Sequence, residues 1–444
     1  MRLSSSDWRK MIVMQQQEGF GLWKKRVGDW LQVARSGGKW ILMFAAGVAL
    51  AAFAFATLLA EFKRIVSVPI WFEFLGLQFL PWPIRAGIFG GAGFVVIAYA
   101  ALRLARMVLH PLLPAGQSIA SVAAQRQRLS RGPRVVAIGG GTGLATLLRG
   151  LKAHSSNITA IITVADDGGS SGRLRRDLGV MPPGDFRNCI TALADDETLL
   201  TQLFRYRFGD DTLDGHSFGN LFITALADIT GSFERGLQEA SKVLAIRGRV
   251  VPSTLQTVTL CAEVRGGDNA PLKRVLGEAS IPGSPGRIER VYLEPDAPAA
   301  YPVALQAILA ADLIVAGPGS LYTSILPNLL LRELADAVRN SAALKVQVCN
   351  MATQLGETDG FTVADHVRAL QAHTGDVLFA NVLANENRHG ELLPNMSWVE
   401  LGEPVPGCRT VTADLCDGEH PWRHDSTKLA EILMGLLGEV RTPV

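Results

Sequence analysis

The sequence predicts an α/β protein with a Rossmann-like, mostly parallel sheet carrying helices on both faces, preceded by a transmembrane helical hairpin. Three observations lead to this prediction. Two long uncharged runs lie within the first 102 of the 444 residues. A glycine-rich turn at residues 139–143 directly follows a β-branched apolar run. From there to the C-terminus, runs of strand length alternate with amphipathic runs of helix length, which is the pattern of βαβ units.

The formal net charge of +2 conceals two parts of opposite sign. Residues 1–134 hold 17 Lys and Arg against 5 Asp and Glu, whereas residues 135–444 hold 26 against 36. The first part therefore carries +12 and the second −10. A hydrophobic content of 48% excludes a disordered chain. The five cysteines, an odd number without a CxxC pair, exclude a disulfide-stapled module and indicate reduced, mostly buried thiols.

The two uncharged runs predict the membrane hairpin. Residues 41–60 are long enough to cross about 30 Å of hydrocarbon as a helix. Residues 86–102 are close to the lower limit for a span, and their glycines would allow close helix packing in lipid: Gly87, Gly90, Gly91 and Gly93. Basic residues dominate both flanks, so positive-inside reasoning places both termini in the cytoplasm and the hairpin in the inner membrane. A pair of buried core helices is the alternative.

These features divide the chain into four parts. We expect a basic cytoplasmic arm over residues 1–40, the hairpin over 41–102, a linker over 103–133 and an α/β domain over 134–444. Because the basic residues flank membrane spans, they favour a lipid bilayer as partner over a nucleic acid. A cleaved signal peptide is not expected, because the arm before the first apolar run is too long.

The elements of the α/β domain follow from the same patterns. Strands at residues 134–138 and 158–164 enclose an amphipathic helix beginning at 144, which makes a right-handed βαβ unit. Residues 250–265 and 287–293 indicate a β-rich insert. Further strands are expected at residues 311–316, 344–348 and 376–382, and further helices at 327–338, 362–372 and 426–437. Thr362 and Asp365 form a capping box at one helix start.

The first motif with chemical potential follows the first strand. Bare backbone N–H groups at a helix N-terminus bind anions, and glycine lets a phosphate approach closely. The motif is neither the dinucleotide fingerprint nor a Walker A loop, because Leu144 and Ala145 follow it. A tight structural turn is the alternative. Its candidate ligand-binding residues are Gly139, Gly140, Gly141, Thr142 and Gly143.

The second motif follows the second strand. Its adjacent carboxylates, Asp166 and Asp167, could bind a ribose, hold a divalent cation or act as a general base, and they are the candidate catalytic residues. Gly168, Gly169 and Ser170 extend the motif as a second loop that a phosphate can approach. A solvated acidic turn is the alternative. Further along, Arg187 and Asn188 open a helix with a cation.

A third motif follows the strand at residues 311–316 and contributes Gly317, Gly319, Ser320 and Tyr322. Tyr322 offers a flat face to a base or sugar, unless it packs in the core. Between the motifs, His216 could donate to a phosphate beside Asn220, with helix capping or core packing as the alternative. A polar loop at residues 350–356 could border the same cleft. No metal site is expected, because Cys408, Cys416, His420 and His424 lack zinc-site spacing.

Together these motifs resemble the YvcK/CofD family. The similar stretches are VVAIGGGTGLATLLRGLK, TVADDGGSSGRLRRDLGVMPPGDFRN, GHSFGNLFITAL and ADLIVAGPGSLYTSILPNLL. Two others, RVYLEPDAPAAYP and TQLGETDGFTVADHV, resemble the YvcK branch, the bacterial gluconeogenesis factors. The resemblance covers the chain from about residue 134 to its end. The preceding residues depart from it, since the usual cytosolic members lack them.

The resemblance implies a Rossmann-like fold that binds a nucleotide sugar, UDP-N-acetylglucosamine in the YvcK branch. It implies a regulatory protein, rather than an enzyme, that is needed for cell shape, peptidoglycan synthesis and growth on gluconeogenic carbon. The CofD branch is 2-phospho-L-lactate transferase, which moves a phospholactyl group from an activated donor onto the deazaflavin Fo with Mg²⁺. Mg²⁺ is therefore the one cofactor under consideration, and homo-oligomerisation stays open. The three motifs would line the nucleotide cleft.

Overall fold

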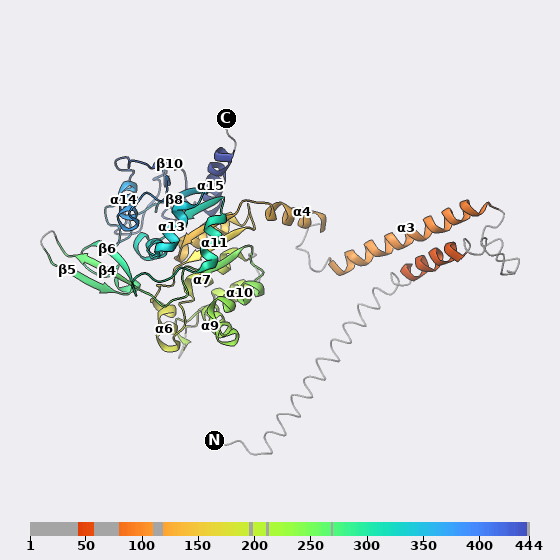
Figure 1. The fold of residues 1–444 in the computed structure, drawn as a ribbon, viewed down its shortest axis with the longest axis horizontal. Coiled ribbons are helices and arrows are strands. Elements are labelled where there is room, and N and C mark those ends of the chain that lie inside the picture. The colour runs from red at the N-terminus through yellow and green to blue at the C-terminus, as the bar shows by residue number, and fades with distance from the viewer. Residues whose placement is uncertain are drawn as a thin grey trace, which may run out of the picture. The chain divides into compact units, whose positions relative to one another are not determined.

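The computed structural model describes residues 43–56, 80–109, 119–194, 199–209, 213–267 and 270–441. The chain divides into two compact units, Met1–Ala124 and Gln125–Val444, which are described separately (Figure 1). The basic arm predicted over residues 1–40 lies outside the described residues.

The first unit contains the helix Met43–Ala56 and the helix α3 (Trp82–Leu109). The two backbones approach closely, because a Cβ atom added at Gly93 would lie 3.1 Å from the carbonyl oxygen of Gly47. Phe53 and Phe89 also pack edge to face, with ring centroids 5.5 Å apart. The other glycines predicted to serve this packing have no described neighbour within 4 Å of an added Cβ: Gly87, Gly90 and Gly91.

Of the described helices, only α3 is long and apolar enough to cross a membrane, by length and composition, over Pro83–Ala101. Its large apolar side chains are exposed, with Phe94 73% and Val95 64% accessible. The described helix Met43–Ala56 covers part of the predicted first span, and residues 41–42 and 57–60 of that span lie outside the described residues. α3 also continues past the predicted end of the second span at residue 102.

The second unit is built on a seven-stranded sheet in the order β10-β9-β8-β7-β1-β2-β3 (Figure 1). Every neighbouring pair is parallel, so the predicted α/β fold with a mostly parallel sheet is confirmed. β1 and β2 are buried along their whole length, as expected for strands covered on both faces. The strands are β1 (Val135–Gly139), β2 (Ile158–Ile162), β3 (Arg249–Pro252), β7 (Leu313–Ala316), β8 (Leu344–Val348), β9 (Asn381–Asn385) and β10 (Arg409–Ala413).

The strand order reverses at β1, since the chain runs outward from β1 to β3 and then returns to β7 on the other side of β1. Right-handed connections therefore place the crossover helices that lead from β1 toward β3 and those that lead from β7 toward β10 on opposite faces, and α15, which follows the last strand, returns to the face of α5. α5 (Gly141–Leu151) packs against α7 (Gly184–Leu193) and α15 (Ser426–Arg441), whereas α11 (Pro302–Ala310) packs against α13 (Arg332–Asn340). The other helices of this unit are α6 (Gly169–Leu178), α8 (Leu199–Arg205), α9 (Phe218–Thr230), α10 (Phe233–Val243), α12 (Leu326–Leu329) and α14 (Val363–Thr374).

A second, antiparallel sheet has the order β5-β4-β6. It comprises β4 (Thr259–Arg265), β5 (Leu272–Leu276) and β6 (Arg287–Glu294), and it extends to one side of the main sheet (Figure 1). This sheet is the predicted β-rich insert, except that the first residues assigned to the insert belong to β3 of the main sheet. A short 3₁₀ turn, Glu278–Ser280, follows β5 and leads back toward the main sheet.

Two predicted elements have different boundaries in the structure. The helix expected over 327–338 is divided into α12 and α13, because Leu331 takes an extended conformation between them. The strand expected from residue 376 begins only at Asn381, since Asp376 is held in the turn after α14, where its carbonyl accepts from Thr374 Oγ1 at 3.0 Å. The capping box of Thr362 and Asp365 at the start of α14 is confirmed.

The second unit begins earlier than the predicted domain start at residue 134. α4 (Ile119–Ser130) occupies much of the segment predicted as a linker, and its Leu129 is buried. Asn157 Nδ2 donates to the carbonyl oxygens of Ser130 and Gly132 at 2.9 and 2.8 Å, which fixes the end of α4 to the turn before β2. The connection before β1 is therefore part of the folded unit.

Candidate functional site

A cavity of about 850 Å³ lies beyond the carboxyl ends of the strands on either side of the reversal point. Ligands of open α/β sheets bind at this position, and the volume suits a ligand the size of a nucleotide. Segments that are far apart in the sequence line it. They comprise residues 140–143, 145–146, 149, 163, 166, 185, 188, 191–192, 205, 278, 318–320, 323–324, 350–354, 393, 396 and 422–424.

The glycine-rich turn forms the floor of the cavity at the start of α5. Gly141 has φ of +68°, a left-handed conformation that favours glycine. A Cβ atom at Gly143 would lie 2.6 Å from the carbonyl oxygen of Pro318, so this position brings two backbones together. Gly140, Gly141, Thr142 and Gly143 line the cavity, whereas Gly139 lies behind it and accepts from Asn328 Nδ2 through its carbonyl oxygen at 3.2 Å.

A carboxylate already lies against this turn. A Cβ atom added at Gly140 would lie 2.5 Å from Asp185 Oδ2, and Asp185 accepts a hydrogen bond from the backbone N–H of Gly141. Burial, reinforced by the nearby charge of Asp166, raises the pKa of Asp185 to about 6. The side chain of Asp185 therefore lies at the N-terminus of α5, where a negative charge is favoured, and the phosphate-binding role of this turn stays a prediction.

Two further carboxylates enclose the same end of the cavity. Burial raises the pKa of Asp166, and Asp166 Oδ1 accepts from the Gly168 N–H at 2.9 Å. Burial and repulsion from Asp166 and Asp185 raise the pKa of Glu278 to about 8. Asp167 lies outside the cavity and supports it, since its Oδ1 accepts from the Ala279 N–H at 2.9 Å beside Glu278. Of the two candidate catalytic residues, only Asp166 lines the cavity.

Basic side chains also line the cavity. They are those of Arg149, Arg205 and Arg423, and all three residues are exposed to solvent. A cavity lined by both carboxylates and guanidinium groups matches a ligand that carries both hydroxyl groups and phosphates. The net charge of −10 on residues 135–444 therefore does not describe the local charge of the site.

The third motif is joined to the loop after β8 by a chain of amide contacts. The Gly319 N–H donates to Asn350 Oδ1 at 3.3 Å, Asn350 Nδ2 donates to Gln354 Oε1 at 2.9 Å, and Gln354 Nε2 donates to Ser320 Oγ at 2.8 Å. Gly319 and Ser320 line the cavity, whereas Gly317 is buried behind it. The polar loop predicted at residues 350–356 borders the cavity through residues 350–354.

Tyr322 does not face the cavity. Its side chain is 3% exposed and packs in the core against Phe361 and His373, with ring centroids 6.3 and 5.9 Å away. Burial raises its pKa to about 12, so its hydroxyl group stays neutral. Tyr322 therefore packs in the core, which was the alternative that the sequence analysis had left open.

A buried polar cluster beside the cavity takes up several other predicted ligand residues. Ser170 Oγ lies 2.9 Å from His216 Nδ1 and accepts from Asn220 Nδ2 at 3.0 Å. Arg187 donates to Ser217 Oγ at 2.5 Å and to Asn188 Oδ1 at 2.7 Å, and burial lowers its pKa to about 10. Only Asn188 of this group lines the cavity. The cluster joins α6, α7 and α9. Six of the predicted ligand residues in this region do not line the cavity: Gly168, Gly169, Ser170, Arg187, His216 and Asn220.

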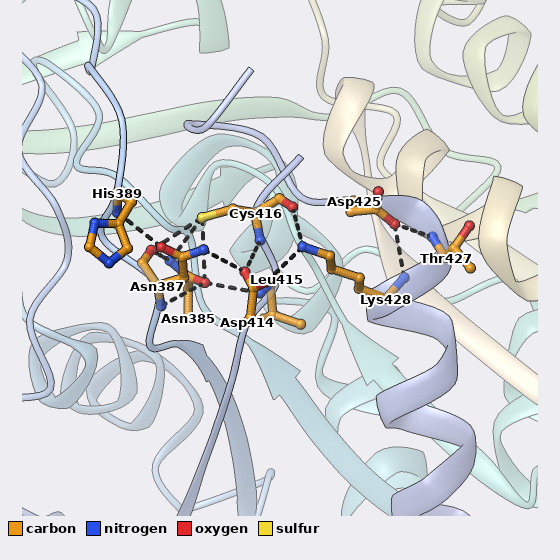
Figure 2. A network of polar contacts seen from close by, with 9 residues as sticks. All are labelled: Asn385, Asn387, His389, Asp414, Leu415, Cys416, Asp425, Thr427 and Lys428. Carbon is orange, nitrogen blue, oxygen red and sulfur yellow. Dashed lines mark hydrogen bonds and ion pairs between the residues drawn. The ribbon is translucent and has the colours of Figure 1, made fainter. Parts of the chain in front are cut away.

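The segment Trp422–His424 also lines the cavity. No motif in the sequence predicted this segment as part of a ligand site. A polar network at the ends of β9 and β10 holds the neighbouring backbone (Figure 2). Lys428 Nζ donates to Asp414 Oδ2 and to the Cys416 carbonyl oxygen at 2.7 and 2.9 Å, and Asp425 Oδ1 accepts from the Thr427 and Lys428 N–H groups. The segment also pairs back on itself through a bridge between Cys416 and His424.

Neither this segment nor the rest of the described chain groups three or more His, Cys, Asp or Glu side chains closely enough to hold a metal ion. All five cysteines are free thiols, and four of them are buried. Besides the Trp422–His424 segment, sequence reasoning missed Asp185 and Glu278. Asp185 lies two residues before Arg187, so its acidic side chain could have indicated a site residue. Glu278 lies in the turn after β5, and no sequence motif marks it as a site residue.

A doubly wound parallel sheet with a cavity at its reversal point defines an open α/β protein of the Rossmann-like class, in which the general position for a ligand is beyond the carboxyl ends of the strands. Residues 135–432 match the family model of 2-phospho-L-lactate transferase CofD. The chain belongs to this CofD family, as the motifs predicted.

The chain is also similar to proteins of known name or structure. It is 43% identical over 452 aligned residues to a relative from Nostoc sp., with 97% of each chain covered. It is 44% identical over 319 residues to the gluconeogenesis factor of Bacillus subtilis, covering 69% of this chain and 99% of that protein. A crystal structure of a UPF0052 family member from Bacillus halodurans superposes with a TM-score of 0.63 at 42% identity, covering 68% of this chain and 99% of that one.

Proposed function

We propose that this protein binds a nucleotide sugar of the UDP-N-acetylglucosamine class and acts as a membrane-tethered regulatory protein linked to cell shape and peptidoglycan synthesis. Its family and its similarity to gluconeogenesis factors support the proposal. The observation that carries it is the single cavity in which backbone N–H groups, carboxylates and arginines converge.

Each part of the lining has a role in this binding. The N–H groups at the start of α5 and the exposed arginines attract the two phosphates. The carboxylates of Asp166, Asp185 and Glu278, which lie close to the start of α5, accept hydrogen bonds from ribose or sugar hydroxyl groups. A phosphate reaches the Gly141 N–H only when Asp185 gives it up, which is easiest when Asp185 is protonated or its charge is neutralised. Binding is therefore coupled to the charge of the acidic end.

Calorimetric titration of the full-length protein in detergent with UDP-N-acetylglucosamine is expected to give saturable heat. Arg205→Gln should weaken binding by about 10-fold, because a charged hydrogen bond to phosphate is lost. Arg176→Gln is the matched control, since Arg176 is exposed on α6 and does not line the cavity. Absence of heat with the wild-type protein would refute the proposed ligand.

A second candidate function is phospholactyl transfer, which the CofD family match favours. Mg²⁺ usually takes one or two protein carboxylates and completes its shell with water and phosphate, and Asp166 and Asp185 are such a pair in the cavity. Bound there, Mg²⁺ would neutralise phosphate charge, while Asp166 is the carboxylate placed to accept a proton from the substrate hydroxyl. Turnover of the deazaflavin Fo with an activated phospholactate would overturn the regulatory proposal.

We also propose that α3 and the residues before it anchor the protein to the inner membrane, with both termini and the second unit cytoplasmic. The full-length chain should sediment with membranes, and deletion of residues 1–118 should release the rest, because it removes all of α3 and retains α4. Deletion of residues 1–40 alone is the control and should leave the protein in the membrane. A full-length protein that stays soluble without detergent would contradict the tether.

A further inference from the structure

The edge of the main sheet that lies opposite the ligand cavity is basic. The cavity lies beyond the carboxyl ends of the strands, whereas Arg134 and Arg249 stand at the amino ends of β1 and β3. Residues 125–134, which lead into β1, hold four arginines and no acidic residue, although residues 135–444 carry −10. Five exposed arginines therefore form a basic edge: Arg126, Arg128, Arg131, Arg134 and Arg249.

The end of α4 is fixed against this edge by the turn before β2. The Ser156 N–H donates to the Leu129 carbonyl oxygen at 3.0 Å, and the Asn157 side chain donates to two further carbonyl oxygens at the end of α4. Leu129 itself is buried. Arg128 and Arg131, on either side of this contact, are therefore attached to the amino ends of the strands and do not belong to a free linker.

A second cavity, of about 390 Å³, opens at the same edge. Its volume is less than half that of the ligand cavity, which suits a smaller group such as a phosphate ester. Arg134 and Arg249 line it together with polar groups from the turns before β2 and β3 and apolar residues of β1, β2 and α11. These other lining residues are Val135, Val136, Ser156, Asn157, Ile158, Thr159, Gly248, Ala307 and Ala310.

The two arginines of this cavity differ in how their charge is balanced. Arg134 pairs with Asp312 at 3.0 Å. Arg249 Nε donates to the neutral Thr159 Oγ1 at 2.8 Å, and Arg249 forms no ion pair within the described residues. A Cβ atom added at Gly248 would lie 2.6 Å from a backbone oxygen of β2, so the backbone beside Arg249 is held closely. A positioned guanidinium without an acidic partner is a preformed site for phosphate oxygens.

We propose that the basic edge docks on the anionic phospholipid surface of the membrane and that Arg249 binds a lipid headgroup phosphate in the second cavity. The inference rests on the proposed tether, because the chain enters the second unit at this edge and only nine residues separate α3 from α4. Each arginine at an anionic bilayer raises partitioning about 5-fold, and salt screens the attraction. Docking alone therefore does not retain the unit once α3 is removed, but it turns the ligand cavity away from the bilayer.

The first test uses residues 119–444, which remain after deletion of residues 1–118. A unit of this kind folds without the preceding helices, since the similar Bacillus halodurans crystal structure covers 99% of that chain and 68% of this one. At low salt, residues 119–444 should co-sediment with vesicles that contain phosphatidylglycerol but not with phosphatidylcholine vesicles, and added salt should release them. Binding to both kinds of vesicle, or to neither, would overturn the inference.

Variants of the same part test the edge residue by residue. Arg249→Gln should weaken binding to anionic vesicles about 5-fold, and Arg126→Gln combined with Arg128→Gln about 25-fold. The matched control, Arg176→Gln combined with Arg235→Gln, removes the same charge from exposed positions on α6 and α10 and should leave binding unchanged. Equal losses in the two double variants would show that net charge alone matters. Urea unfolding of each variant separates loss of binding from loss of fold.

Two further measurements identify the source of the phosphate and test the whole chain. Tighter binding of inorganic phosphate or a single-stranded oligonucleotide, with the same dependence on Arg249, would overturn the assignment to lipid. In nanodiscs, the full-length protein should exchange amide hydrogens over residues 125–134 more slowly with anionic than with neutral lipid, and equal exchange would contradict docking. A full-length protein that is soluble without detergent would instead refute the tether, and the vesicle result would still decide whether the basic edge binds lipid.

Discussion

Alanine at position 143 is expected to lower the free energy of unfolding by about 3 kcal/mol and to abolish ligand binding. The added Cβ atom would lie 2.6 Å from the oxygen and 2.9 Å from the carbon of the Pro318 carbonyl group. These are backbone atoms of a loop whose Gly317 N–H is bonded to the Ile138 carbonyl oxygen at 2.9 Å, so the loop cannot yield without disturbing β1. Gly143 and Pro318 both line the cavity, so relief of the clash would move two parts of the lining apart. Stability and ligand binding are therefore expected to be lost together.

The matched control for this substitution is Gly435→Ala. Gly435 lies in α15, and an added Cβ atom there would have no neighbour within 4 Å. Alanine at this position should be neutral or stabilise the protein by about 0.5–1 kcal/mol through helix propensity. Urea unfolding and calorimetry of both variants check the prediction. Equal stability of the two would show that the approach of α5 to the Pro318 loop is not tight.

The ligand-free protein is expected to lose stability as the pH rises from about 4 to about 8. In the folded state, the pKa values of Asp185 and Glu278 are raised to about 6 and about 8, from 3.8 and 4.5. Over this interval the folded protein therefore binds more protons than the unfolded chain, and the free energy of unfolding falls with increasing pH. A shift of about two pKa units at Asp185 alone corresponds to about 2–3 kcal/mol.

Asp185→Asn should remove that part of the pH dependence and leave the variant more stable than the wild type at pH 8. Asparagine retains an acceptor for the Gly141 N–H but carries no charge beside Asp166. Urea unfolding midpoints at several pH values measure the effect. Glu431→Gln, on the exposed side of α15, is the control and should follow the wild type. A wild-type slope in Asp185→Asn would mean that burial does not raise the pKa of the Asp185 carboxyl group.

This expected gain in stability identifies the acidic end as a functional feature. Burial of three neighbouring carboxyl groups outweighs the nearby charges of Arg175 and Arg187, so these groups weaken the folded state when they ionise, and proteins keep such arrangements at sites that use them. Binding of a hydroxyl-rich ligand or a cation at this end would relieve the repulsion. The pH dependence should accordingly diminish when the site is occupied.

Local patterns were sufficient to predict most of the fold. β1 and β2 followed from short apolar runs, and the capping box of α14 followed from two residues at fixed spacing. The errors occurred where a neighbouring segment changed the outcome. Leu331 interrupts a helical pattern between α12 and α13, and residues 250–252 pair with β2 although the pattern assigned them to the insert.

The amino-acid pattern alone was enough to establish a parallel α/β sheet with glycine-rich and acidic motifs at its strand ends, because hydrophobic period and turn chemistry act over a few residues. Residues from all three motifs that it placed at strand ends line the cavity. Tertiary packing determined which side chains within those motifs face the cavity, turning Asp166 inward, Asp167 outward and Tyr322 into the core. It also added Glu278 and His424, which lie more than 100 residues from Asp166. Side-chain direction and burial depend on contacts between distant segments, which no local pattern contains.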